Sequence, residues 1–185
     1  RTEGLGLLSA ADAIALGQSG PVLRASGVDW DLRKTQPYLA YNQVDFDVPV
    51  FPEGDVYARY RVHMEEMRES TRIVAQCIDV LEGMEGEPCI ADDRKVVLPP
   101  RHELHTSMES LIHHFKIATE GYRVPAGEAF VPIESPRGEM GFYIVSDGSG
   151  RPYKAHVRAP SFYNLSAIGR LAEGGLVADL VALIG

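Results

Sequence analysis

The sequence predicts a mainly α-helical fold with one small antiparallel β-sheet. Helical spacing of apolar residues over about 55–82, and a change to strand-like patterning over about 129–158, carry this prediction. The length of 185 residues fits one domain with a sizeable core. We expect residues 1–185 to form a single partial domain, a piece of a longer protein. The chain begins with Arg1, not Met, and ends inside an apolar segment.

The strongest local signal is the long helix. Asp55 can cap its N-terminus and Gly83 can end it. At ~1.5 Å per residue such a helix spans roughly 40 Å. Steps of three and four residues predict one stripe facing a core, formed by Tyr57, Tyr60, Met64, Met67, Thr71, Val74, Ile78 and Leu81.

Shorter elements flank this helix. Ser9 predicts a cap for a helix over 10–16, and alternating residues over 44–50 predict a short edge strand. Thr106 and Glu109 fit a capping box that opens a helix ending before Gly121. We expect this helix to bury Met108, Leu111, Ile112 and Phe115.

Three strands are predicted next, over 129–134, 141–146 and 153–158, with a hairpin turn at 147–150. Asn164 is expected to cap a helix over 165–172, before a last apolar helix. That final run is much shorter than the ~20 residues needed to cross a bilayer.

Composition excludes several classes of protein. Hydrophobic residues make up 45% and charged residues 24%, as in folded soluble proteins. The 26 acidic and 18 basic side chains give a net charge of -8, which argues against nucleic-acid binding. Two cysteines, Cys77 and Cys89, are too few for a disulfide framework or a four-thiolate metal site. So few cysteines favour a location in a reducing compartment.

The histidines and cysteines carry no clear catalytic motif. His102 and His105 are one residue short of the zinc-protease spacing, and adjacent His113 and His114 diverge on a helix. We interpret them as surface or packing residues, and Cys77 as a core residue. No metal site is predicted.

Charged residues stand out at two other places. Glu134, Arg137 and Glu139 lie between two predicted strands, and Arg158 ends the third strand. Strand pairing can bring Arg158 to the Glu134–Glu139 end of the sheet or leave it at the opposite end. Asp179, within an apolar helix, must be exposed on one side, paired, or buried with a shifted pKa.

A set of collinear motifs closely resembles the D-subunit family of NADH-quinone oxidoreductase, respiratory complex I. The resemblance covers the whole chain but only about the C-terminal half of the family's full-length members. The motifs are RTEG at 1–4, GPVLRASG at 20–27, WDLRKTQPY at 30–38, FDVPV at 46–50, MEEMR at 64–68, SMESLIHHFK at 107–116, TEG at 119–121, ESPRGE at 134–139, VSDG at 145–148, RPY at 151–153, RAP at 158–160 and AD at 178–179.

The resemblance implies the C-terminal part of a fold like that of the large subunit of nickel–iron hydrogenases. It implies that the former metal cavity forms, with the B subunit, a chamber where quinone takes electrons from an iron–sulfur cluster. No cofactor is expected on this chain, since the iron–sulfur clusters and FMN belong to other subunits. The quinone-contacting residues lie in the absent half, so we expect no catalytic residue here and no activity of this chain alone.

The resemblance also implies partners and a location. The expected partners are other complex I subunits, especially the B and C subunits, together with quinone as the substrate. The complex would couple NADH oxidation to proton translocation. The full-length protein would lie peripherally on the cytoplasmic side of a bacterial membrane, or on the matrix side of the inner membrane in mitochondria.

Chamber or structural candidates in this chain are Glu134, Arg137, Glu139, Arg158 and Asp179. Arg137 resembles the hydrogenase arginine that faces the metal cavity, and we expect it to pair with Glu134 or Glu139. Asp179 is expected to be partly buried, hydrogen-bonded and engaged in anchoring the C-terminal tail. The alternative function is a non-catalytic structural module that binds neighbouring subunits. A hydrogenase-type metalloenzyme is disfavoured by the missing cysteines.

Overall fold

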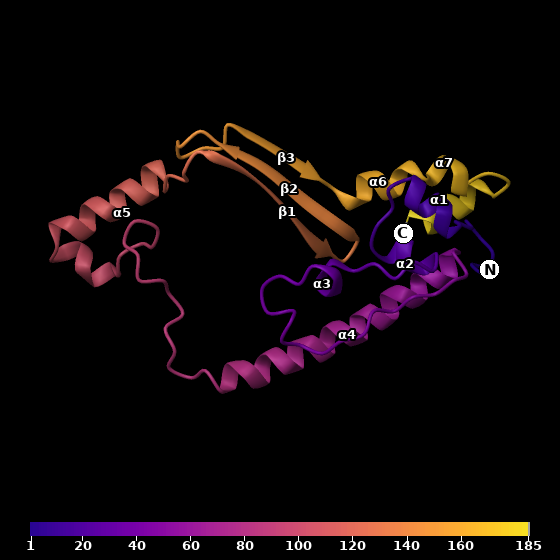
Figure 1. Cartoon of the computed structure of the whole chain (residues 1–185), viewed down its shortest axis with the longest axis horizontal. Coiled ribbons are helices and arrows are strands. Elements are labelled where there is room, and N and C mark those ends of the chain that lie inside the picture. The colour runs from indigo at the N-terminus through magenta and orange to yellow at the C-terminus, as the bar shows by residue number, and fades with distance from the viewer. Residues whose placement is uncertain (185) are drawn as a thin grey trace. The chain divides into compact units, whose positions relative to one another are not determined.

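The computed structural model describes residues 1–184 (Figure 1). The chain divides into two compact units. Unit 1 comprises residues 1–83, 131–142 and 157–184, and unit 2 comprises residues 84–130 and 143–156. Helices predominate, with one antiparallel three-stranded sheet in the order β1-β2-β3, so the predicted fold class is confirmed. Membership of residues 1–185 in one larger domain stays a prediction.

The helices of unit 1 are short apart from one. They are α1 Ala10–Ala15, α2 Pro21–Ala25, α3 Leu32–Thr35, α4 Val56–Glu82, α6 Pro160–Ser166, α7 Ile168–Leu171, the 3₁₀ turn η2 Val177–Asp179, and α8 Leu180–Ile184. Unit 2 contains the 3₁₀ helix η1 Arg101–His105 and α5 Met108–Glu120. The strands are β1 Gly127–Ser135, β2 Gly138–Ser146 and β3 Lys154–Arg158, as predicted apart from their ends.

Two apolar clusters hold unit 1 together. In the first, Leu8 and Leu23 pack with Leu171 and Leu183, so that α2 contacts the C-terminal helices. In the second, Ala25 of α2 packs against Ala58 and Val62 of α4. The start of α4 is therefore fixed against α2. None of the helices described within residues 1–184 combines the length and apolarity required to cross a membrane.

The predicted bounds of α4 are confirmed, but its predicted burial is wrong. The Asp55 carboxylate accepts hydrogen bonds from the backbone N–H groups of Ala58 and Gly4, both at 2.7 Å, and Gly83 follows the last helical residue. The stripe residues from Met67 to Leu81 are largely exposed, because no other element of unit 1 covers that face. The buried positions are instead Ala58, Arg59 and Val62.

Several smaller predictions also need correction. Residues 44–50 form no strand, because the backbone N–H groups of Asp45 and Asp47 donate to the side chains of Gln76 and Glu69 on α4. Ser107, not Thr106, caps α5 by accepting from the backbone N–H of Ser110. The apolar side chains expected to be buried by α5 are exposed: Met108, Leu111, Ile112 and Phe115.

Candidate functional site

The turn between β1 and β2 is held tightly against α2 in unit 1. A Cβ added to Gly20 would lie 2.3 Å from the Cα of Gly138, and one added to Gly138 would lie 2.5 Å from the hydroxyl of Ser19. Both glycines also have positive φ, which other residues rarely adopt. The Ser19 hydroxyl accepts a hydrogen bond from the backbone N–H of Glu139 at 3.1 Å. Backbone contact therefore fixes the turn that carries Arg137.

Arg24 of α2 forms a buried hub beside this turn, and its side chain is only 1% exposed. Its Nε donates to Oε1 of Glu66 at 2.9 Å, and its Nη1 donates to Oε1 of Glu134 at 3.0 Å. The same Nη1 lies 3.6 Å from Oδ2 of Asp31. One guanidinium thus holds three carboxylates from α4, β1 and the loop before α3.

Two neighbouring carboxylates in this hub differ in their pKa. Burial raises the pKa of Asp31, but hydrogen bonds and the positive charge of Arg33, with the charge of Arg24, outweigh it and lower the pKa overall. Burial also raises the pKa of Glu134, the charge of Asp31 adds to this, and Arg24 only partly opposes them, so its pKa is raised overall. Glu134 is therefore the carboxylate that takes up a proton first on acidification.

Tyr38 also fixes the end of β1, through hydrogen bonds to the backbone of Glu134. Its hydroxyl accepts a hydrogen bond from the backbone N–H of Glu134 at 3.0 Å and donates to the carbonyl of the same residue at 3.4 Å. The pKa of Tyr38 is raised, chiefly by burial. Side chain and backbone of Glu134 are thus both held by residues of the N-terminal segment.

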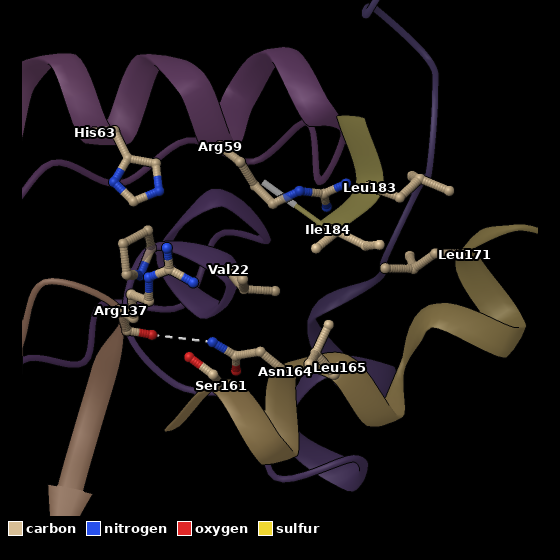
Figure 2. A pocket seen from close by; sticks show the side chains of 11 residues that line it. Val22, Arg59, His63, Arg137, Ser161, Asn164, Leu165, Leu171, Leu183 and Ile184 are labelled. Atoms are coloured by element: carbon tan, nitrogen blue, oxygen red, sulfur yellow. Dashed lines mark hydrogen bonds between the residues drawn. The ribbon is translucent and has the colours of Figure 1, made fainter. Parts of the chain in front are cut away.

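The predicted pairing of Arg137 with Glu134 or Glu139 is wrong, because Glu134 is taken by Arg24. Across residues 1–184 the guanidinium of Arg137 makes no ion pair. Its carbonyl accepts a hydrogen bond from Nδ2 of Asn164 at 2.9 Å (Figure 2). Asn164 itself lies within α6 and is not the helix cap that the sequence predicts.

The side chain of Arg137 lines a pocket of about 190 Å³ within unit 1 (Figure 2). Arg59 and His63 of α4 lie in the same wall, and Ser161 and Asn164 of α6 add polar groups. The remaining lining is apolar: Pro21, Val22, Leu165, Leu171, Leu183 and Ile184.

Arg158 lies at the Glu134–Glu139 end of the sheet, which resolves the two registers left open by the sequence. Its Nη1 donates to the carbonyl of Glu139 at 2.6 Å, and its Nη2 donates to the carbonyl of Gly17 at 3.2 Å. The guanidinium carbon stands 4.6 Å from the centre of the Tyr163 ring. Arg158 therefore joins β3 to β2 and to the segment after α1.

Asp179 is partly buried and hydrogen-bonded, with 13% of its side chain exposed. Its carboxylate accepts from the backbone N–H of Leu176 and from Nη2 of Arg1, each at 3.1 Å. The first bond caps the 3₁₀ turn η2. Among residues 1–184 no hydrogen bond or ion pair links Asp179 to the Arg24 hub. Its role in anchoring a tail stays a prediction.

Sequence reasoning did not single out Arg24, Asp31 or Arg59. A signal existed for Arg24, which stands between Leu23 and Ala25 in a short apolar helix. The spacing of the histidines was weighed only for metal binding, and it did not predict that His63 lines the pocket. In the part of the chain that the structure describes, no three His, Cys, Asp or Glu side chains gather in an arrangement that could hold a metal ion.

Comparison with known proteins defines the class to which this fold and site belong. Curated relatives named as the D subunit of NADH-quinone oxidoreductase match all of the chain and 44% of their own length. They include the D subunit numbered 1 of Herpetosiphon aurantiacus, 59% identical, and the D subunits of Coxiella burnetii and Methylobacillus flagellatus, 55% and 53% identical. The chain thus spans less than half the length of these relatives.

The family described as the 49 Kd subunit of respiratory-chain NADH dehydrogenase matches residues 1–185. The chain belongs to this family. The resemblance found in the sequence motifs is therefore confirmed.

Removing the Arg24 side chain should strongly destabilise the fold. In Arg24→Ala three carboxylates lose their shared cation in a site with little water, and breaking a buried pair typically costs ~3–5 kcal/mol. We expect a loss of this size in urea unfolding of the full-length protein. Arg68→Ala is the matched control, because Arg68 pairs with Glu65 on the exposed face of α4. Its loss should be ~0–1 kcal/mol; equal losses for the two variants would contradict the hub.

The raised pKa of Glu134 predicts a particular pH dependence. The unfolded chain ionises this group near its ordinary value of 4.5 and the folded chain at higher pH. As the pH rises above 4.5, the free energy of unfolding of the parent therefore falls relative to that of Glu134→Gln. The fall is at most about 1.4 kcal/mol per pH unit. Urea unfolding of the full-length protein from pH 4.5 to pH 8 measures the difference. A difference in stability that does not change with pH would show that the pKa of Glu134 is not raised.

Proposed function

We propose that this chain is part of the quinone-reducing module of a proton-translocating NADH:quinone oxidoreductase. The observation that carries the proposal is the match of the whole chain to the 49 Kd subunit family. The names of the relatives supply the reaction class, an oxidoreductase complex that uses NADH and quinone. The net charge of -8 agrees with protein and quinone partners and not with nucleic acid.

In this proposal the turn between β1 and β2 forms part of the wall of a quinone chamber that the B subunit completes. The Arg24 hub and Tyr38 fix Glu134, and Arg158 fixes the backbone at Glu139. Arg137 is thereby presented on a rigid support, and its guanidinium is not neutralised by either glutamate. The pocket beside Arg137 is a recess in that wall. At about 190 Å³ it lies below the ~300–1,000 Å³ of typical organic-ligand pockets, so the chamber needs a partner surface.

The remaining parts of the machinery lie outside this chain in our proposal. FMN and the iron–sulfur clusters belong to other subunits, with the B and C subunits as direct neighbours. Asp179, which caps η2, anchors the polypeptide that follows it. The full-length protein is peripheral, on the cytoplasmic side of a bacterial membrane or the matrix side in mitochondria. This chain alone is inactive.

A structural role in assembly is the second candidate function. It is favoured by the apolar face of α5 in unit 2, where Met108 is 74% exposed and Phe115 is 66% exposed. Apolar faces of this kind mark contacts with other protein. In this alternative the chain only binds its neighbours, and no residue near the β1–β2 turn affects quinone reduction.

Replacing Arg137 separates the two functions. In the assembled complex, Arg137→Ala should reduce NADH:quinone reductase activity about tenfold or more, the effect of losing one charge-assisted contact. NADH oxidation with an artificial acceptor at the flavin should be unchanged. Because Arg137 has no carboxylate partner within residues 1–184, the variant leaves no orphaned buried charge and should assemble. Parent-like quinone reductase activity in a fully assembled variant would favour the purely structural role.

A further inference from the structure

We propose that the pocket of unit 1 lined by Arg59, His63 and Arg137 binds a small oxyanion of the phosphate or carboxylate class. Three basic side chains line it, and its lining contains no Asp or Glu. The inference goes beyond the quinone chamber, because it assigns a ligand to the recess itself.

The two buried arginines of unit 1 differ in how their charge is compensated. Arg24 faces three carboxylates. Arg59 is also buried, with 8% exposure, but its guanidinium donates only to the carbonyls of Gly54 and Gly6, at 3.3 Å and 3.2 Å. Within residues 1–184 Arg59 makes no direct ion pair; the charge of Asp55, at the N-terminal cap of α4, only partly offsets the effect of burial, and the pKa of Arg59 is lowered. A buried guanidinium whose charge is only partly compensated is unfavourable, so an anion in the pocket would stabilise it.

Arg137 brings further positive charge to the same pocket, and His63 brings an imidazole that can be protonated. In the view of Figure 2, Arg137 lies between His63 and Ser161, and the Arg59 side chain enters from α4 farther along the wall. The hydroxyl of Ser161 makes no hydrogen bond to any other residue in the described chain, whereas Nδ2 of Asn164 is already used by the carbonyl of Arg137. A guanidinium fork and a free hydroxyl are the donors that oxyanions accept.

The size and walls of the pocket favour a small ion. A volume of about 190 Å³ is ample for a tetrahedral or planar oxyanion. Val22, Leu165 and Leu171 form apolar walls around the charges. A low local dielectric strengthens the attraction between the bound ion and the guanidinium groups.

Binding should also draw a proton to His63. Burial lowers the pKa of His63; Glu66 on α4 opposes this, and Arg24 on α2 and Arg137 at the turn lower it further. The imidazole is therefore neutral in the empty pocket at pH 7. An oxyanion favours the imidazolium form, so the affinity for acetate, whose charge is constant over this range, should rise as the pH falls from 8 to 6.

Equilibrium dialysis of the assembled complex against radiolabelled inorganic phosphate tests the site. We expect the parent to bind one phosphate per complex that Arg137→Gln binds at least about tenfold more weakly. Arg137→Lys retains the charge and should recover part of the affinity. The matched control is Arg61→Gln, since Arg61 lies on the same helix as Arg59 but does not line the pocket and pairs with Glu53; it should bind as the parent does.

Four results would overturn the proposal. The first is equal phosphate binding by the parent and Arg137→Gln, with native gels showing that both assemble. The second is an equal loss in Arg61→Gln. The third is displacement of phosphate by chloride as effectively as by acetate, because a built oxyanion site distinguishes them whereas ionic screening does not. The fourth is an acetate affinity, measured by competition with phosphate, that keeps the parent's pH dependence in His63→Gln.

Phosphate binding and quinone reduction are separate readouts, so the two proposals fail independently. Loss of phosphate binding with parent-like quinone reductase activity in Arg137→Gln supports the oxyanion site and contradicts the chamber role of Arg137. Loss of quinone reductase activity without any change in phosphate binding overturns the oxyanion site alone.

Discussion

The buried guanidinium of Arg24 is the constraint on which the described geometry of unit 1 depends. It joins α2 to Glu66 on α4, to Glu134 on β1 and to Asp31 before α3, three segments that are far apart in the sequence. Burying any one of these carboxylates without a cation would be energetically costly. Arg24 and the three carboxylates can therefore be buried only as a group. This mutual requirement places the β1–β2 turn, and Arg137 with it, beside the pocket.

The arginines of unit 1 differ in whether nearby groups neutralise their positive charge. This difference separates arginines that support the fold from those available to a ligand. Arg24 is surrounded by acids and acts as a fixed support, and Arg158 is engaged by backbone carbonyls and an aromatic ring. Within the described chain Arg59 and Arg137 make no direct ion pair, the charge of Asp55 only partly compensates that of Arg59, and both side chains line the pocket. A rigid support carrying unneutralised charge is the arrangement required for binding an anionic or polarisable ligand.

Local signals in the sequence predicted much of the fold, but they did not predict which charged side chains pair at the site. Caps and glycines located α1, α4 and the sheet, because these depend on neighbouring residues alone. The edge strand over 44–50 failed because its N–H groups bond to side chains on α4. The apolar stripe of α4 predicts a partner surface, which the described residues of unit 1 do not supply. Arg137 was placed at the correct turn, but its partner could not be predicted, since Arg24 is 110 residues from Glu134.

A double-mutant cycle between Arg24 and Glu134 in the full-length protein tests the central claim most directly. Arg24→Ala, Glu134→Ala and the double variant are compared with the parent by urea unfolding, and the coupling energy isolates the pair from its other contacts. The account predicts a favourable coupling of about 1–3 kcal/mol, because both groups are buried and directly bonded. A coupling below about 0.5 kcal/mol would contradict it, since additive losses are typical of independent sites.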